Sequence, residues 1–191
     1  DGRWAGLIGA SEAALAAAIA TVGVGVETRT IGAAVENAIC SRGFQPIRNL
    51  TGHGVARWTV HCAPQIPSYP EGRDRLKDGM VIAIEPFSST GEGMIYERGK
   101  AEVFMLVRPP RNATGVDKDV LKAIQAWRGL PVARRYFNDF PADVVESTLS
   151  KLSRQGALIR FPPLVEDPGV MTAQTEHTMI VTEEGVEVIT A

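Results

Sequence analysis

A short apolar run, Met80–Ile84, constrains the fold of this chain more than any other feature. The turn sequence Lys77-Asp78-Gly79 precedes the run, and Glu85 follows it directly. A nearly continuous apolar run of strand length is typical of a strand that is buried on both faces. An acid at the end of such a strand needs a cation or hydrogen-bond donors, because an unpaired buried carboxylate is costly. The run therefore predicts a covered sheet that ends in a carboxylate with a partner.

Two helices are predicted before this strand. The residues from Ile8 to Thr21 are strong helix formers, and the Gly23/Gly25 pair is expected to end that helix. Thr30 is positioned to cap a second helix, in which apolar residues recur at helical spacing until Gly43. The first half of the chain is therefore expected to begin with a helix pair.

Other segments alternate as strands do. Apolar and polar residues alternate over Arg57–His61, which predicts a strand. Near the C-terminus, His177–Thr182 and Val186–Thr190 are joined by Glu-Glu-Gly and predict a hairpin. Together with the two helices, these segments indicate a mixed α/β fold.

The stretch from Val116 to Leu164 has a different character. Apolar spacing predicts one helix around Val120–Ile124 and another between Pro141 and Gly156, followed by a short strand over Ala157–Phe161. A helix, a turn and a strand in this order suggest a small winged-helix-like unit. Its arginines are scattered, so packing is favoured over nucleic-acid contact as the role of this unit.

Composition narrows the class of protein. A length of 191 residues, with 45% hydrophobic and 22% charged residues, is typical of one soluble domain or one domain with an insertion. The formal charge is −2 and no Lys/Arg run is present, which argues against nucleic acid as the primary partner. The two cysteines lack a C-x-x-C spacing and favour a reducing cytoplasm. The longest apolar stretch, Ala13–Ala20, is too short to span a membrane.

Four side chains are candidates for chemistry. His53 and His61 are two of only three histidines, and an extended segment would place both on one face. Glu85 and Glu176 each adjoin an apolar strand. Imidazole and carboxylate groups together suit a divalent metal and hydrolysis. The alternatives are hydrogen-bonded structural histidines and solvated surface glutamates.

These residues lie in motifs that resemble the signatures of type II methionine aminopeptidases, the archaeal and eukaryotic class. The resemblance covers nearly the whole chain from Ile8, and the inserted unit between Glu85 and Glu176 points to type II over type I. The motifs are Pro46-Ile47-Arg48-Asn49, Asn49-Leu50-Thr51-Gly52-His53 with His61 eight places later, Ile84-Glu85-Pro86-Phe87-Ser88-Ser89-Thr90-Gly91, Phe161-Pro162-Pro163-Leu164 and Ala173-Gln174-Thr175-Glu176-His177-Thr178.

The resemblance implies a pita-bread α/β (α+β) fold. Residues 1–110 and 165–191 would form the catalytic domain, and residues 111–164 would form an inserted winged-helix-like subdomain. The implied activity is removal of initiator methionine from nascent proteins and peptides by a metal-activated water. We also expect a cytoplasmic monomer, and the ribosome is a candidate partner.

The resemblance also assigns roles to residues. His53, Glu85 and Glu176 would bind two divalent ions of cobalt, manganese, iron or zinc, with Glu176 bridging the ions and Glu85 shuttling a proton. His61 would hydrogen-bond the substrate and help to stabilise the tetrahedral intermediate. Val60 and Phe161 would line the methionine pocket, although core packing is the alternative for both.

The sequence departs from the family pattern at its start. The family supplies two aspartate ligands and another histidine from this region, yet Gly6 occupies one aspartate position and nothing precedes Asp1. With both aspartates missing, the chain should be weakly active or inactive.

Two explanations compete for this departure. Residues omitted from the sequence would leave a wide backbone gap between Ala5 and Gly6, after a strand over residues 1–5. Alternatively, the chain is a ligand-deficient, non-catalytic relative that binds the ribosome or another macromolecule. A third possibility is a related hydrolase, either an aminopeptidase that cleaves before proline or a creatine-type hydrolase.

Overall fold

The computed structural model describes residues 2–191, which divide into two compact units. The first unit runs to Tyr96 and resumes at Glu166–Ala191, and the inserted unit is Glu97–Val165. The sequence placed the start of the insertion at residue 111. Residues 97–110 go with the inserted unit because β7 (Val103–Leu106) pairs with β9 (Leu158–Phe161).

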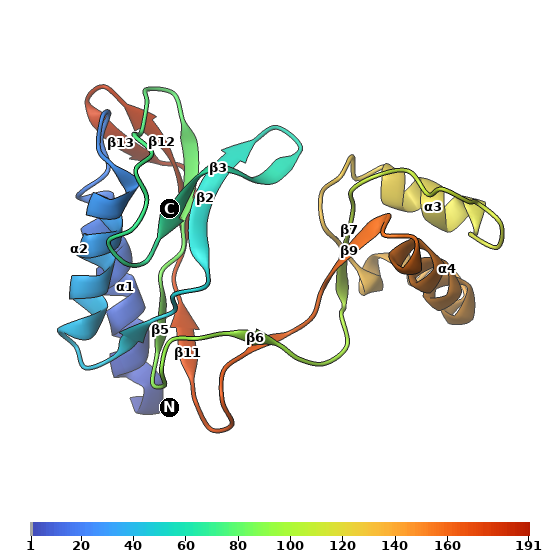
Figure 1. Cartoon of the computed structure of the whole chain (residues 1–191), viewed down its shortest axis with the longest axis horizontal. Coiled ribbons are helices and arrows are strands. Elements are labelled where there is room, and N and C mark those ends of the chain that lie inside the picture. The colour runs from blue at the N-terminus through green and yellow to red at the C-terminus, as the bar shows by residue number, and fades with distance from the viewer. Residues whose placement is uncertain (1) are drawn as a thin grey trace. The chain divides into compact units, whose positions relative to one another are not determined.

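The first unit begins with helices (Figure 1). A short 3₁₀ helix, η1 (Gly2–Trp4), leads into α1 (Ala5–Ile19). The strand and the backbone gap predicted here are wrong, since Ala5 and Gly6 are consecutive residues of one helix. The alanine-rich sequence favours helix, and no strand of residues 2–191 pairs with this segment. Asp1 lies outside the described residues.

The second helix, α2 (Thr28–Cys40), begins earlier than predicted. Its N-cap is Glu27 rather than Thr30, because the Thr28 N–H donates to the Asp74 carbonyl at 2.9 Å and turns the chain into the helix. Gly32 lies where α2 meets the segment after β3. A Cβ at Gly32 would stand 2.0 Å from the Tyr69 carbonyl oxygen, so only glycine permits this approach.

Two antiparallel sheets complete the first unit. The predicted strand after Gly79 and the predicted C-terminal hairpin are confirmed. The five-stranded sheet has the order β13-β12-β4-β2-β3, and the three-stranded sheet has the order β1-β5-β11. The bounds are β1 (Gln45–Pro46), β2 (Thr51–Ala56), β3 (Thr59–Pro67), β4 (Val81–Ile84), β5 (Phe87–Ser89), β11 (Thr172–Gln174), β12 (His177–Thr182) and β13 (Gly185–Val188).

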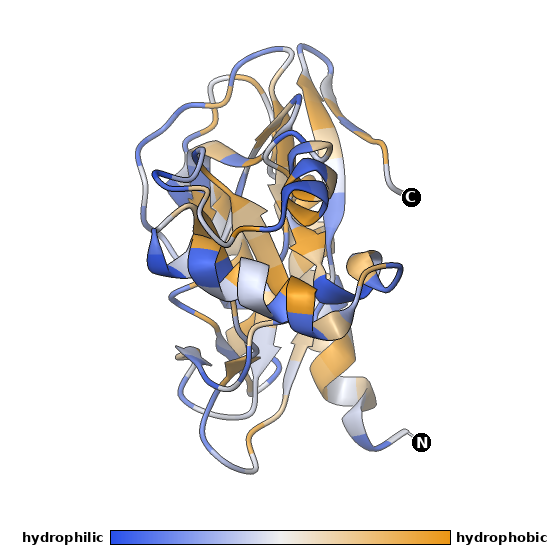
Figure 2. Ribbon diagram, turned by 90° about the vertical axis from the view of Figure 1, so that its right-hand side faces the viewer, coloured by the Kyte–Doolittle hydropathy of each residue, from blue (hydrophilic) through white to orange (hydrophobic). Residues whose placement is uncertain are grey.

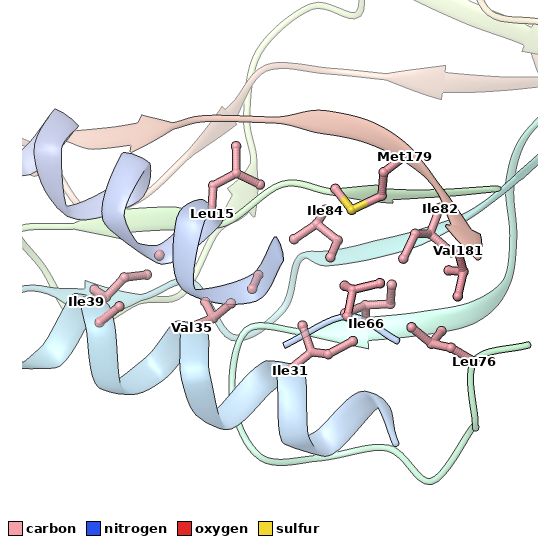
Figure 3. Packing of buried hydrophobic residues seen from close by; sticks show 14 residues of the cluster. Leu15, Ile31, Val35, Ile39, Ile66, Leu76, Ile82, Ile84, Met179 and Val181 are labelled. Carbon is pink, nitrogen blue, oxygen red and sulfur yellow. The ribbon is translucent and has the colours of Figure 1, made fainter. Parts of the chain in front are cut away.

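The helix pair and the larger sheet share one apolar core (Figure 3). Leu15 and Val35 on the helices face Ile82, Ile84 and Met179 on the strands. All five are almost completely buried. Each such side chain contributes about 1.5–3 kcal/mol when it leaves water, so this core holds the strand ends in place.

The inserted unit has its own core. Its two predicted helices are confirmed as α3 (Lys118–Gln125) and α4 (Ala142–Arg154), with Pro141 at the N-cap of α4 and Gly156 at φ 65° after its end. Figure 2 shows hydrophilic and hydrophobic residues alternating along the helices. The other elements are η2 (Arg134–Phe137) and the sheet β8-β7-β9, with β8 at Val132–Ala133; β6 (Tyr96–Glu97) pairs with β10 (Leu164–Val165). Within residues 2–191, no helix is both long and apolar enough to cross a bilayer.

Candidate functional site

Glycines on both sides hold His53 between neighbouring strands. A Cβ at Gly52 would lie 2.6 Å from the Ala83 carbonyl oxygen, and one at Gly54 would lie 2.2 Å from the Ala63 carbonyl oxygen. The strands therefore approach β2 closely on either side, and His53 is only 8% exposed. The His53 Nδ1 lies 3.0 Å from the Gly54 carbonyl oxygen. A carbonyl only accepts, so Nδ1 carries the proton and Nε2 faces the site.

His61 reaches His53 from the next strand. The two ring centroids are 4.4 Å apart, with an angle of 83° between the planes. The sequence predicted that an extended segment would bring both histidines to one face. The two rings do meet, but from two strands, because Arg57 and Trp58 form a turn and Trp58 has φ 62°. Register shifts at Gly54 then bring His61 opposite the end of β2. Burial, and secondly the nearby His53, lower the pKa of His61.

Glu85 lies directly after β4, beside His53. Its Oε1 is 3.4 Å from the His53 Nε2, and both side chains are largely shielded from water. The hydrogen bond that the protonated His53 ring donates to Glu85 raises the pKa of His53, while burial opposes this effect. In the protonated ring both nitrogens donate, Nδ1 to Gly54 and Nε2 to Glu85. The imidazole and this carboxylate can therefore hold a proton between them.

The side-chain amide of Gln174, which was not predicted from the sequence as a site residue, joins Glu85 and Glu176. The Gln174 Nε2 donates to the Glu85 Oε2 at 2.9 Å and to the Glu176 Oε2 at 3.2 Å. Glu176 is exposed as a residue, but its carboxylate is partly desolvated. This desolvation is the main cause that raises the pKa of Glu176, and the negative charge of Glu85 is the second. Its position two residues before Glu176 could have identified Gln174 as a site residue, because alternate residues of an extended segment share a face. Thr175, between them, instead contacts the Ser11 hydroxyl at 2.7 Å.

The remaining predicted positions are less closely connected to this group. Val60 is half-buried on β3 next to His61. Phe161 is half-buried on β9 of the inserted unit, so its part in a methionine pocket stays a prediction. His177 was expected to point away from Glu176, and its Nδ1 lies 3.0 Å from the Thr190 hydroxyl.

The described residues fit a pair of metal ions incompletely. One imidazole and two carboxylates lie near one another, joined through Gln174. Nevertheless, no three His, Cys, Asp or Glu side chains in residues 2–191 are grouped as a metal ion requires. Three donors would also under-coordinate two divalent cations, which need more anionic ligands to offset their charge.

Comparison with known proteins gives concordant matches. The sequence profile of metallopeptidase family M24 matches residues 5–183. A methionine aminopeptidase of Archaeoglobus fulgidus is 39% identical over 186 residues, which cover 96% of this chain and 62% of that protein. A methionine aminopeptidase 2 of Sordaria macrospora is 32% identical over 98% of this chain and 46% of its own length. The chain thus spans less than two thirds of the length of these relatives.

A solved structure shares the fold. The structure of a thermophilic Arx1 superposes with a TM-score of 0.83 over 98% of this chain and 57% of that one, at 15% identity. This identity is low, so the likeness concerns the fold alone. With the sequence matches, it confirms the predicted pita-bread fold and the predicted resemblance to methionine aminopeptidases.

Proposed function

The chain belongs to metallopeptidase family M24, and on that premise we propose that it acts in an aminopeptidase that releases methionine from the N-terminus of peptides and nascent chains. The observation that carries this proposal is the gathering of His53, His61, Glu85 and Glu176 around the end of β4. These groups come from separate segments of the chain, and a purely structural role does not require them to meet.

Two side chains have proposed roles in the reaction. Glu85, which follows β4 beside His53, would take a proton from the attacking water. His61 is neutral near pH 7 because its pKa is lowered, so its ring can donate a hydrogen bond to the oxygen of the scissile amide. Val60 and Phe161 are the proposed walls of the methionine pocket.

The proposed metal ligands are His53, Glu85 and Glu176, for two divalent ions of the cobalt, manganese, iron or zinc type. A proton on the His53 Nε2 and a metal ion compete for the same lone pair, so this ligand would have to lose its proton first. Because the described donors fit two ions incompletely, we derive no step of the reaction through a metal.

The decisive experiment measures methionine release from a peptide that begins Met-Ala-Ser. The protein is stripped with chelator, dialysed, and assayed with added Mn²⁺ or Co²⁺ by mass spectrometry. Glu85→Gln should lower release by a factor of about 100 or more, because a general base typically contributes that much. Glu92→Gln, which removes an exposed carboxylate of the same unit, should leave release unchanged. Equal rates for the two variants would refute the proposal.

A second candidate function is a non-catalytic, ligand-deficient relative that binds the ribosome or another macromolecule. The incomplete set of donors favours it. The same assay separates the two candidates, provided that metal content is measured in parallel. A folded protein that retains no divalent metal and releases no methionine with any added ion would support the second candidate.

A further inference from the structure

A pocket of about 240 Å³ lies within the inserted unit, and none of its lining residues belongs to the candidate active site. We propose that this pocket binds a phosphate group. Helix α4, strands β7 and β9 and the short helix η2 supply most of its walls. The lining residues are Lys100, Ala101, Phe104, Arg134, Glu146, Leu149, Ser150, Ser153, Arg154 and Arg160.

One face of α4 forms a wall of this pocket. Its five lining residues occupy positions 146, 149, 150, 153 and 154, the spacing that places side chains on a single helix face. On the opposite wall, Phe104 pairs directly with Arg160 across β7 and β9, so both side chains lie on the same face of the sheet. Two rigid elements therefore present their polar groups to a common space.

The lining carries an excess of positive charge. Its four basic residues face one acid, Glu146. Arg134 is neutralised, since it pairs with both Glu102 and Glu146. Lys100 lies 3.4 Å from the same Glu146, and Arg154 donates only to the uncharged Ser150 hydroxyl at 2.8 Å. Within residues 2–191, the Arg160 side chain makes no hydrogen bond and no ion pair. Arg154 and Arg160 are therefore cations that no carboxylate balances.

Ser153 provides an independent observation. Its Oγ is buried and has no hydrogen-bond partner among the described residues. A buried hydroxyl left unpaired loses its bonds to water without replacement, which is unfavourable. Ser153 also lines the pocket, and rotation of its side chain toward that space would let the hydroxyl donate to an oxygen of a ligand.

The guanidinium and hydroxyl donors of the lining indicate which ligand the pocket would bind. Guanidinium groups match the oxygens of phosphate in paired hydrogen bonds, and a hydroxyl adds a neutral donor. The volume is below the roughly 300–1,000 Å³ of pockets that enclose drug-sized ligands, so a small group suits it. Another pocket of the inserted unit provides a contrast, because its lining includes Asp117 and Asp143 and no basic residue.

The charge of the whole unit supports an anionic ligand. The inserted unit holds twelve Lys and Arg against seven Asp and Glu, a formal charge of +5. The first unit holds eight against fifteen, a formal charge of −7. An anion approaching this chain is therefore attracted to the inserted unit.

Titration calorimetry of the whole chain with inorganic phosphate, at constant ionic strength set by NaCl, tests the site. Wild type should show saturable binding at one site. Arg160→Gln should weaken binding about tenfold, the loss of one charge-assisted contact, and Ser153→Ala should weaken it severalfold. Arg111→Gln, an exposed arginine of the same unit outside the lining, should change affinity less than twofold. Thermal melts establish that each variant is folded.

Two results would overturn the proposal. One is wild-type protein that shows no saturable binding. The other is Arg160→Gln and Ser153→Ala both binding as Arg111→Gln does. Uridine monophosphate and a short single-stranded oligouridylate identify the source of the phosphate. An oligouridylate that binds much more tightly and is displaced by phosphate indicates a nucleic-acid backbone, whereas equal affinities indicate a free phosphate or nucleotide. Oligouridylate binding that is insensitive to Arg160→Gln would also count against the pocket.

Discussion

The first unit and the inserted unit carry opposite charge and build their polar sites in different ways. In the first unit, Glu85 directly follows β4 and Glu176 directly precedes β12, and the antiparallel register of these two strands brings them together. In the inserted unit, one face of a helix gathers Ser150, Ser153 and Arg154. Sheet register joins residues that are distant in sequence, whereas a helix face joins residues three or four apart.

The net charge of the whole chain does not describe either unit. The formal charge of −2 is the sum of −7 and +5, and neither unit resembles the average. The argument against a polyanionic partner therefore applies to the first unit and not to the inserted one. Charge should be counted by structural unit whenever the units have separate cores.

Ile124→Ala should have the largest effect, and it tests most directly whether the two units are stabilised separately. Ile124 is 1% exposed in the core of the inserted unit, and removing its side chain should cost about 4 kcal/mol. Native-state hydrogen exchange should show the loss in α3 and α4 but not in α1 and α2, because the two cores share no residue. Ile124→Val should cost about 1 kcal/mol. Equal loss of protection in both units would show that they do not unfold separately.

Gly32→Ala should produce the next largest effect, and in the first unit. The new Cβ would overlap the Tyr69 carbonyl oxygen at 2.0 Å, so backbone must move at a cost of about 3 kcal/mol. Urea denaturation followed by hydrogen exchange in β3 and β4 measures this cost. Gly9→Ala is the matched control, because nothing lies within 4 Å of its Cβ and alanine favours helix. A Gly32→Ala protein as stable as the control would contradict the close approach.

Glu166→Ala should destabilise the first unit by about 2 kcal/mol. This carboxylate is 8% exposed, accepts from the Gly93 N–H at 2.8 Å and pairs closely with the Ser89 hydroxyl. Its removal leaves both donors buried without a partner. Asp167→Ala, at the exposed neighbouring position, should be nearly neutral in the same thermal unfolding experiment. Similar losses from both substitutions would mean that Glu166 does not act through these bonds.

Asp117→Ala should have the smallest effect, about 1 kcal/mol, and should be confined to the inserted unit. The Asp117 carboxylate caps α3 by accepting from the N–H groups of Asp119 and Val120, each at 3.0 Å. Asp117→Asn keeps an equivalent cap and should restore nearly full stability. Exchange rates of the first-turn amides of α3 report the change, and rates equal in both variants would exclude the capping role.

Local pattern predicted most of the elements and part of the site. The apolar run before Glu85 forms β4, and the spacing around Val120 and Val145 forms α3 and α4. The strand predicted over Arg57–His61 begins only at Thr59, because a non-glycine residue, Trp58, adopts positive φ in the turn, which alternation of side chains does not reveal. The cap at Thr30 failed because a distant carbonyl, that of Asp74, binds the Thr28 N–H.

The mixed α/β class, an inserted unit and the candidates His53, His61, Glu85 and Glu176 were all predictable from the sequence, because periodicity and motif spacing are local properties. The sequence did not reveal that Gln174 joins the two glutamates, or that Ser153, Arg154 and Arg160 line one pocket. These contacts depend on strand register and on how closely backbones approach. Both are set by packing between segments that lie far apart in the chain.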